Sequence, residues 1–92
     1  MAEMNLSFSG SIPQLYDRYL GPVLFEPYAA DLVRRVTALA APGPVLEMAC
    51  GTGIVTRQLR AHLAPTVELV ASDLSQPMLD YARAKLATLQ HV

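Results

Sequence analysis

The sequence predicts an α/β fold that begins a doubly wound parallel sheet, and two observations carry that prediction. Short apolar runs alternate with stretches of helical periodicity, so the expected order is helix, helix, strand, helix, strand, helix. Strands separated by helices pair in parallel through right-handed crossovers. With 92 residues, 52% of them hydrophobic and 16% charged, the chain can form one domain with a modest core.

Two helices are expected before the first strand, after a flexible lead-in at residues 1–10. The first spans about 11–20 and is expected to end at Gly21-Pro22, because glycine favours a helix terminus and proline cannot continue the hydrogen-bond ladder. The second is expected over about 26–41. Residues 11–41 are therefore predicted to form a helical cap over a cofactor-binding half at residues 42–92.

Two short strands are predicted, each followed by a helix. Residues 45–48 form the first strand, and their continuous apolar character predicts cover on both faces of the sheet. Residues 67–72 form the second strand. Thr52 is expected to cap the helix after the first strand, and Ser75 is expected to cap the helix after the second.

Composition excludes several classes of function. Seven basic against eight acidic residues give a formal charge of −1, so the basic stripe of a nucleic-acid binder is absent and Arg34-Arg35 is interpreted as a polar helix face. The single cysteine, Cys50, cannot form an internal disulfide or a thiolate metal cluster, and no base is spaced to activate it, so a buried apolar role is expected. No basic leader or membrane-length apolar run is present, and we expect a cytoplasmic protein.

The densest chemical signal is the segment Val-Leu-Glu-Met-Ala-Cys-Gly-Thr-Gly at residues 45–53. Gly51 and Gly53 form a turn in which a ligand can approach the backbone, because glycine carries no Cβ. Asp73 lies twenty-two residues after Gly51, at the end of the next strand, where an acid accepts hydrogen bonds from ribose hydroxyls. The sequence therefore predicts a nucleoside cofactor at the carboxyl edge of the sheet.

The residues around this turn favour one cofactor. Thr56 stands where a dinucleotide fingerprint has its third glycine, which disfavours NAD and FAD, and the lysine of a phosphate-binding loop is absent. Glu47 places a negative charge beside the loop, which repels phosphate but favours a sulfonium ligand that also bears an ammonium group. S-adenosylmethionine fits both Glu47 and Asp73.

At these residues the sequence resembles the class I, Rossmann-like, S-adenosylmethionine-dependent methyltransferases. Residues 45–53 look like their first motif and residues 71–79 like their second. Residues 12–19, followed by 25–28, are similar to the helical cap of small-molecule members, including quinone-type methylases. One departure is Ala49, which stands where the family often has its first glycine.

The resemblance implies a role for each site residue. Gly51 and Gly53 would let the loop approach the methionine moiety, Asp73 would hold the ribose, and Met78 would lie against the adenine or belong to the core. Tyr16 and Tyr19 would cover the cofactor or pack the cap. The expected cofactor-binding set is Glu47, Ala49, Gly51, Gly53, Asp73, Leu74, Met78, Tyr16 and Tyr19.

The resemblance also implies that the chain is incomplete. The later strands, the catalytic residues and most contacts to a small-molecule acceptor are expected beyond Val92, so we expect an N-terminal fragment that is inactive alone. Two alternatives are an NAD-type oxidoreductase fragment and a non-enzymatic module that uses half of a Rossmann-like fold for assembly. Since two strands leave open edges and apolar faces, we predict a dimer or higher oligomer.

Overall fold

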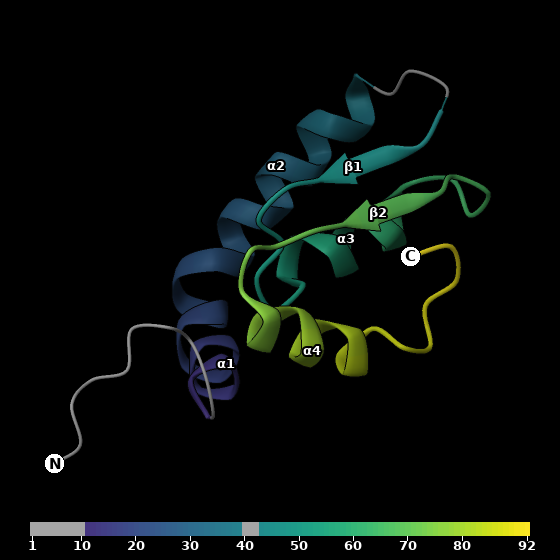
Figure 1. Ribbon diagram of the computed structural model, residues 1–92. Coiled ribbons are helices and arrows are strands. Elements are labelled where there is room, and N and C mark those ends of the chain that lie inside the picture. Colours follow the sequence, from purple (N-terminus) through teal and green to yellow (C-terminus); the bar gives the residue numbers. More distant parts are fainter. Residues whose placement is uncertain (1–10, 40–42) are drawn as a thin grey trace, which may run out of the picture.

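A computed structural model describes residues 11–39 and 43–92. Its element order confirms the predicted partial Rossmann-like α/β fold (Figure 1). The expected lead-in at 1–10 and the predicted end of the second helix at 40–41 lie outside the described residues. The elements are α1 (Ile12–Leu15), the π-helix η1 (Tyr16–Phe25), α2 (Glu26–Ala38), β1 (Val45–Glu47), α3 (Ile54–His62), β2 (Leu69–Ala71) and α4 (Gln76–Lys85).

The sheet has two parallel strands, as predicted. Val45 pairs with Leu69 and Glu47 with Ala71, so both strands end at the same edge. Figure 1 shows both arrowheads pointing toward the helical tract that contains α1 and α2. The turns that follow the strands therefore lie beside the N-terminal helices.

The core lies between the sheet and two helices. One buried cluster contains Val33 of α2, Leu59 of α3, Leu63 directly after α3, and Leu69 of β2. Leu59 and Leu63 are four residues apart, which is the spacing of the apolar stripe expected of an amphipathic helix. This cluster fixes α2 and α3 on one face of the sheet.

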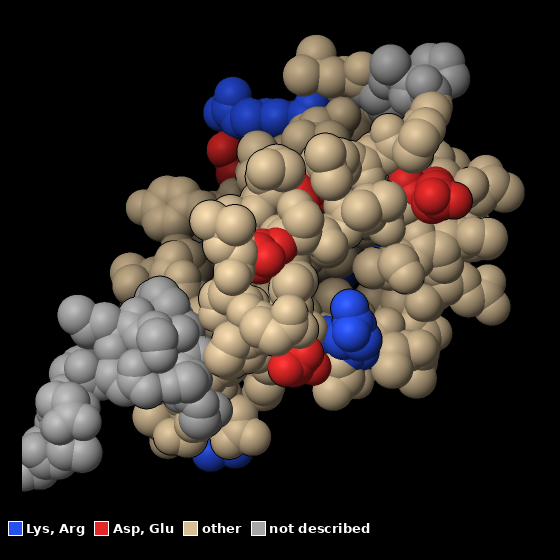
Figure 2. Space-filling view, viewed as in Figure 1, with Lys and Arg blue, Asp and Glu red and all other residues tan. Residues whose placement is uncertain are grey.

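The other face of the sheet is open in the part of the chain that the structure describes. Leu46 is 62% exposed and Val70 is 46% exposed, because alternate residues of a strand point to opposite faces. Figure 2 shows this side of the molecule as largely uncharged, with acidic and basic side chains scattered over it. The expectation that β1 is covered on both faces is therefore wrong for residues 11–39 and 43–92.

The predicted helix end at Gly21-Pro22 is wrong. The backbone continues from α1 through the π-helix η1 into α2, and the Glu26 amide donates to the Gly21 carbonyl in the wider turn of that helix. A Cβ on Gly21 would lie 3.3 Å from Cδ1 of Ile54, so the glycine permits close packing of η1 against the start of α3. Tertiary packing here overrides the local stop signal.

The two predicted helix caps have different outcomes. Ser75 caps α4 as expected, since its Oγ accepts a hydrogen bond of 3.4 Å from the Met78 amide. Thr52 does not cap α3, whose N-cap residue is Gly53 and which has no side-chain cap. The Thr52 hydroxyl instead donates to Asp17 of η1, 35 residues earlier in the chain.

The outer edge of β2 is partly occupied. The Leu69 amide donates to the His91 carbonyl at 2.8 Å, so the chain beyond α4 returns to this edge. The expectation of two fully open edges therefore needs correction at this position.

Among the described residues, no helix is long and apolar enough to cross a membrane.

Candidate functional site

The turn after β1 is built from left-handed backbone. The φ angles are +57° at Ala49, +57° at Gly51 and +90° at Gly53. Glycine adopts this region freely, whereas a residue with a Cβ is strained there by roughly 1–2 kcal/mol. Ala49, the departure from the first motif, therefore occupies a position whose backbone favours glycine.

Asp73 holds this turn in place. Its Oδ2 accepts from the Gly51 amide at 2.8 Å, and its Oδ1 accepts from the Ser75 amide at 2.8 Å. The Cys50 amide donates to the Ser72 carbonyl, which continues the parallel pairing beyond the strands. One carboxylate thus fixes both turns at the carboxyl edge of the sheet.

A hollow of about 470 Å³ opens between these turns and the N-terminal helical tract. A Cβ built on Gly51 meets no atom within 4 Å, so the glycine leaves this side of the turn open. Met78 is only 4% exposed, which means that its side chain belongs to the core as well as to the wall of the hollow. The lining residues are Tyr16, Ala49, Gly51, Asp73, Leu74, Ser75 and Met78, and all but Ser75 belong to the expected set.

Three residues of the expected set do not line this hollow. Gly53 is buried, and a Cβ there would lie 2.8 Å from Cδ1 of Leu86, so this glycine allows α3 to pack closely against α4. Tyr19 is 60% exposed on η1. Glu47 lies at the end of β1, where its side chain turns toward α3.

Glu47 is anchored by the residue that replaces the third glycine of a dinucleotide fingerprint. The Oγ1 of Thr56, which is fully buried, donates to Glu47 Oε1 at 2.5 Å. Burial raises the pKa of Glu47, and the Thr56 hydrogen bond offsets part of that rise. Thr56 therefore positions an acid instead of making room for a pyrophosphate.

Cys50 is buried, as predicted, and its environment disfavours the thiolate. Burial raises its pKa to about 11, and the negative charges of Glu47 and Asp73 act in the same direction. The thiol is therefore protonated at neutral pH and is a poor nucleophile. When ionised, the two carboxylates therefore give the turn a negative potential.

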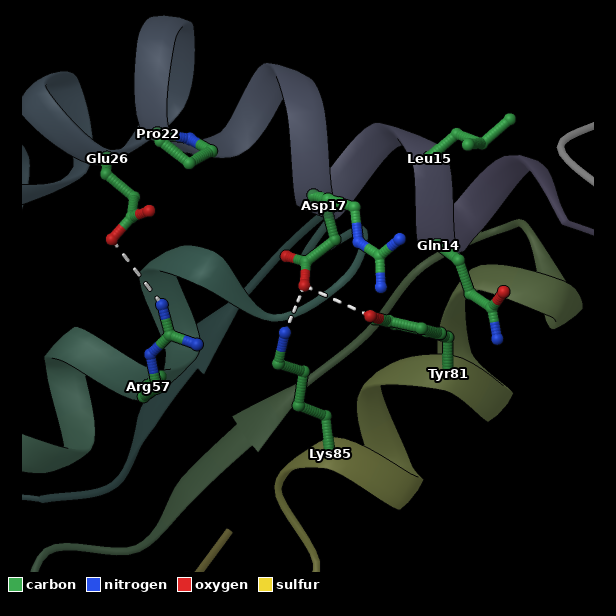
Figure 3. Close-up of a pocket in the computed structure, with 9 residues that line it drawn as sticks. Gln14, Leu15, Asp17, Pro22, Glu26, Arg57, Tyr81 and Lys85 are labelled. Atoms are coloured by element: carbon green, nitrogen blue, oxygen red, sulfur yellow. Dashed lines mark hydrogen bonds and ion pairs between the residues drawn. The ribbon is translucent and has the colours of Figure 1, made fainter.

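A second polar cluster was not found by sequence reasoning. Asp17 of η1 is 9% exposed and lines a polar hollow of about 530 Å³ on another side of the helical tract (Figure 3). It accepts hydrogen bonds from Thr52 Oγ1 at 3.0 Å, from Tyr81 Oη at 3.1 Å and from Lys85 Nζ. Arg57 and Glu26 form a longer ion pair of 3.7 Å in the same hollow.

The charges of this cluster stabilise one another. Burial acts to raise the pKa of Asp17, but the hydrogen bonds from Lys85, Thr52 and Tyr81 outweigh it and hold the pKa below its ordinary value. The Asp17 hydrogen bond raises the pKa of Lys85. The one local sequence signal is that Tyr81 and Lys85 are four residues apart and share a face of α4.

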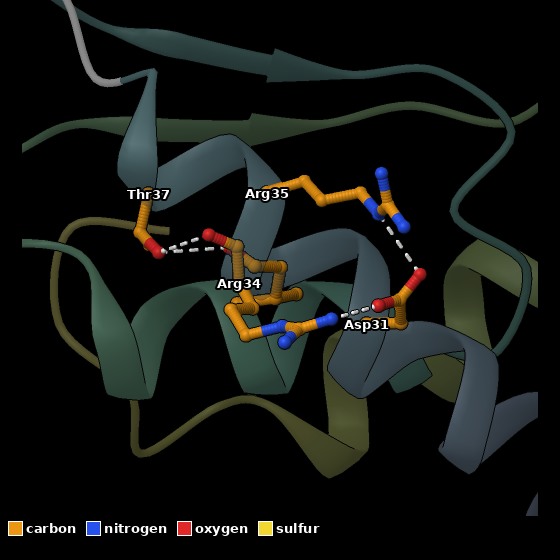
Figure 4. Close-up of polar contacts among 5 residues, drawn as sticks. Asp31, Arg34, Arg35 and Thr37 are labelled. Carbon is orange, nitrogen blue, oxygen red and sulfur yellow. Dashed lines mark hydrogen bonds and ion pairs between the residues drawn. The ribbon is translucent and has the colours of Figure 1, made fainter.

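The basic pair on α2 shares one acidic partner on its own helix. Asp31 accepts from Arg35 Nε at 3.0 Å and also pairs with Arg34 (Figure 4). Hydrogen bonds from Arg34 and Arg35 lower the pKa of Asp31. Within the described ranges, no three His, Cys, Asp or Glu residues are grouped so as to hold a metal ion.

Comparison with known proteins places this arrangement in a family. Residues 45–92, just over half of the chain, match the family model described as a methyltransferase domain. Over 73 residues, 76% of this chain, the sequence is 41% identical to the biotin biosynthesis bifunctional protein BioCD of Bordetella avium (strain 197N). Over 45 residues, 49% of this chain, it is 42% identical to ribosomal RNA small subunit methyltransferase C of Enterobacter sp. (strain 638).

The chain spans 16% and 13% of the lengths of these two relatives. The segment that matches the family contains both strands, the turn after β1 and Asp73. This segment carries both motifs that resemble the methyltransferases, whereas the cap residues 12–19 and 25–28 lie outside it. The chain therefore belongs to the methyltransferase domain family.

Proposed function

We propose that the hollow at the carboxyl edge of the sheet binds S-adenosylmethionine as a methyl donor. The observation that carries this proposal is the convergence of Gly51, Asp73 and Met78, which the sequence spreads over 28 positions, on one hollow. In this proposal residues 42–92 are the cofactor-binding half, and residues 11–41 are a helical cap that contributes Tyr16. The family membership supports methyl transfer as the reaction.

The hydrogen-bond acceptors and the apolar surface at the hollow fit this cofactor. Each carboxylate oxygen of Asp73 accepts one backbone N–H and retains capacity for a second hydrogen bond, so both can accept from vicinal ribose hydroxyls. The open side of Gly51 leaves room for the methionine moiety to approach the backbone. The apolar edge of Met78 offers a surface for the adenine ring.

The chemistry that this chain contributes is positioning. When bound, the sulfonium of S-adenosylmethionine supplies both the methyl group and the leaving group. The residues of the chain orient the donor, and the negative potential of Glu47 and Asp73 favours its two positive charges. Alignment of an acceptor for in-line attack needs further walls, so we propose that the 92 residues alone bind the donor without catalysing transfer.

We propose a small molecule as the acceptor. The formal charge of −1 and the partial compensation of Arg34 and Arg35 by Asp31 argue against the strongly basic surface that binds a phosphate backbone. The relative that aligns over most of this chain is named for biotin biosynthesis, which supports a small-molecule acceptor here. Binding of a ribosomal RNA fragment that weakens steeply with salt would contradict this proposal.

We also propose that the isolated chain self-associates through the open face of the sheet. Three large apolar side chains are exposed at the sheet, namely Leu46 of β1, Met48 directly after β1, and Val70 of β2. An apolar sheet face of this kind is normally covered. Light scattering at micromolar concentration tests this. A dimer or larger oligomer is expected, and a well-folded monomer with a sharp melting transition would contradict it.

Calorimetry tests the proposed donor site. The 92-residue chain should bind S-adenosylmethionine and S-adenosylhomocysteine and should not respond to NAD. An exposed surface variant, Arg34→Ala, serves as a control that should bind like the wild type. Binding of NAD without either methionine derivative would favour an oxidoreductase fragment, and binding of none by a folded chain would favour an assembly module.

A further inference from the structure

Tyr16 and Asp17 are sequence neighbours that serve different hollows. Tyr16 lines the candidate donor hollow, whereas Asp17 lines the polar hollow. The π-helix η1 is therefore a wall shared by both. Any force that holds Asp17 also fixes the position of Tyr16, because adjacent residues of a helix move together.

Three side chains donate hydrogen bonds to Asp17, and they come from the two other segments that line the candidate methyl-donor hollow. Thr52 lies between the two glycines of the turn after β1. Tyr81 and Lys85 lie on α4, three and seven residues after Met78. Figure 3 shows the carboxylate of Asp17 between η1 and α4, with Tyr81 and Lys85 pointing toward it. One buried carboxylate thus joins η1, the glycine turn and α4, which each contribute a residue to the donor hollow.

Apart from the close approach of Gly21 to Ile54 and the stacking of Tyr16 on Phe25, residues 12–25 bury few apolar groups. Within residues 12–25 the buried residues are Pro13, Asp17 and Gly21, and several large apolar side chains are exposed. The main core cluster of Val33, Leu59, Leu63 and Leu69 contains none of the residues that bond to Asp17. Loss of the Asp17 hydrogen bonds should therefore loosen residues 12–25 and leave that core folded.

We propose that Asp17 is a positioning residue that holds Tyr16 against the donor hollow and thereby sets the affinity for the methyl donor. This inference rests on the proposed function. It implies that donor binding and ordering of residues 12–25 are coupled, so that each favours the other. All three bonds are accepted by a charged carboxylate, but Lys85 also brings a positive charge, whereas Thr52 and Tyr81 donate from neutral hydroxyls.

Four variants of the 92-residue chain test the proposal. Asp17→Asn weakens all three bonds, and Lys85→Met removes the positive charge but keeps an unbranched apolar stem. Lys85→Arg restores a charged donor and is the conservative rescue. Arg83→Met is the matched control, because it removes a positive charge from an exposed position of α4 with no ion pair among the described residues.

Two measurements are made on each variant. The first is affinity for S-adenosylhomocysteine by calorimetry, and the second is amide hydrogen exchange in residues 12–25 without ligand. We expect Asp17→Asn and Lys85→Met to lose about tenfold in affinity and to exchange faster in this segment. Lys85→Arg should recover most of the affinity, and Arg83→Met should match the wild type.

The outcomes separate this inference from the proposed function. If the wild type binds and both Asp17→Asn and Lys85→Met bind equally well, the positioning role is overturned. If the wild type binds no donor, the proposed function fails, and exchange still tests the hold on η1. In that case unchanged amide exchange in Asp17→Asn overturns the claim that Asp17 orders residues 12–25. Faster exchange confined to these residues supports that claim. Should Asp17→Asn fail to fold, Lys85→Met and Lys85→Arg provide the same comparison.

Discussion

Gly51 and Gly53 lie two residues apart in one turn, and their surroundings are opposite. A Cβ on Gly51 would project into open space at the edge of the hollow, whereas one on Gly53 would meet Leu86 at 2.8 Å. Both residues have positive φ angles, so backbone strain alone does not distinguish them. The difference teaches that the two glycines have separate consequences: Gly53 permits close packing of helices, and Gly51 leaves open the side of the turn where we propose that the donor binds.

The largest expected effect breaks the ligand side. Gly51→Val should abolish measurable binding of S-adenosylhomocysteine, because the branched side chain fills the space that the donor needs. Gly43→Val is a matched control, since Gly43 also has a positive φ and open space but precedes β1 at the other end of the strand. Calorimetry and circular dichroism of both variants check this, and equal binding by the two would refute the ligand role of Gly51.

The next effect breaks the packing side. Gly53→Ala should lower the free energy of unfolding by about 2–4 kcal/mol, because it adds backbone strain to overpacking against Leu86. Gly51→Ala should cost only the strain, about 1–2 kcal/mol. Urea unfolding measures both.

A second substitution sharpens the assignment of the Gly53 effect. Leu86→Ala opens space beside Gly53, so the double variant should be more stable than the sum of the two single effects predicts. Strict additivity would show that the contact with Leu86 is not the cause.

The comparison of the glycines also shows how far the sequence leads. Periodicity and turn residues predicted the order of the elements, and strand-end spacing predicted that Gly51 and Asp73 lie at the same edge of the sheet, where the structure joins them by a hydrogen bond. The motif gave no means of separating Gly51 from Gly53, because Leu86 lies 33 residues later in the chain. The neighbours of a glycine are set by tertiary packing, which a single motif does not encode.

The same limit explains the features that were missed. Asp17 looks like an ordinary helical acid, since its partners lie 35, 64 and 68 residues away. Thr52 has the chemistry of a cap, but its hydroxyl is used by Asp17. Gly21-Pro22 has the local pattern of a helix end, but the helical backbone continues through it, and Gly21 packs against Ile54. In each case a distant partner decides the outcome.

Asp73 allows a milder change on the ligand side. Asp73→Asn should weaken binding of S-adenosylhomocysteine by about 1–3 kcal/mol, because a neutral amide replaces a charged acceptor and offers one oxygen where two are used. Asp80→Asn, on the exposed face of α4, is the control. An affinity for Asp73→Asn equal to that of the control would remove Asp73 from the site.

The smallest expected effect concerns Glu47, which lies outside the lining of the hollow but contributes to its negative potential. Burial raises the pKa of Glu47, so folding favours the neutral form of this side chain. The stability that this preference contributes is lost as the pH rises through the raised pKa. A cationic donor favours the ionised form and therefore lowers this pKa when it binds. Affinity for S-adenosylmethionine should consequently increase as the pH rises from acid toward neutral.

Glu47→Gln isolates this contribution, since the amide can still accept from Thr56 but carries no charge. The variant should bind the donor a few-fold more weakly at neutral pH, with a flatter dependence on pH below it. Calorimetry over a pH series on the wild type and the variant makes the comparison. Identical profiles would show that the field of Glu47 does not reach the ligand and that Asp73 is the acid on which the site depends.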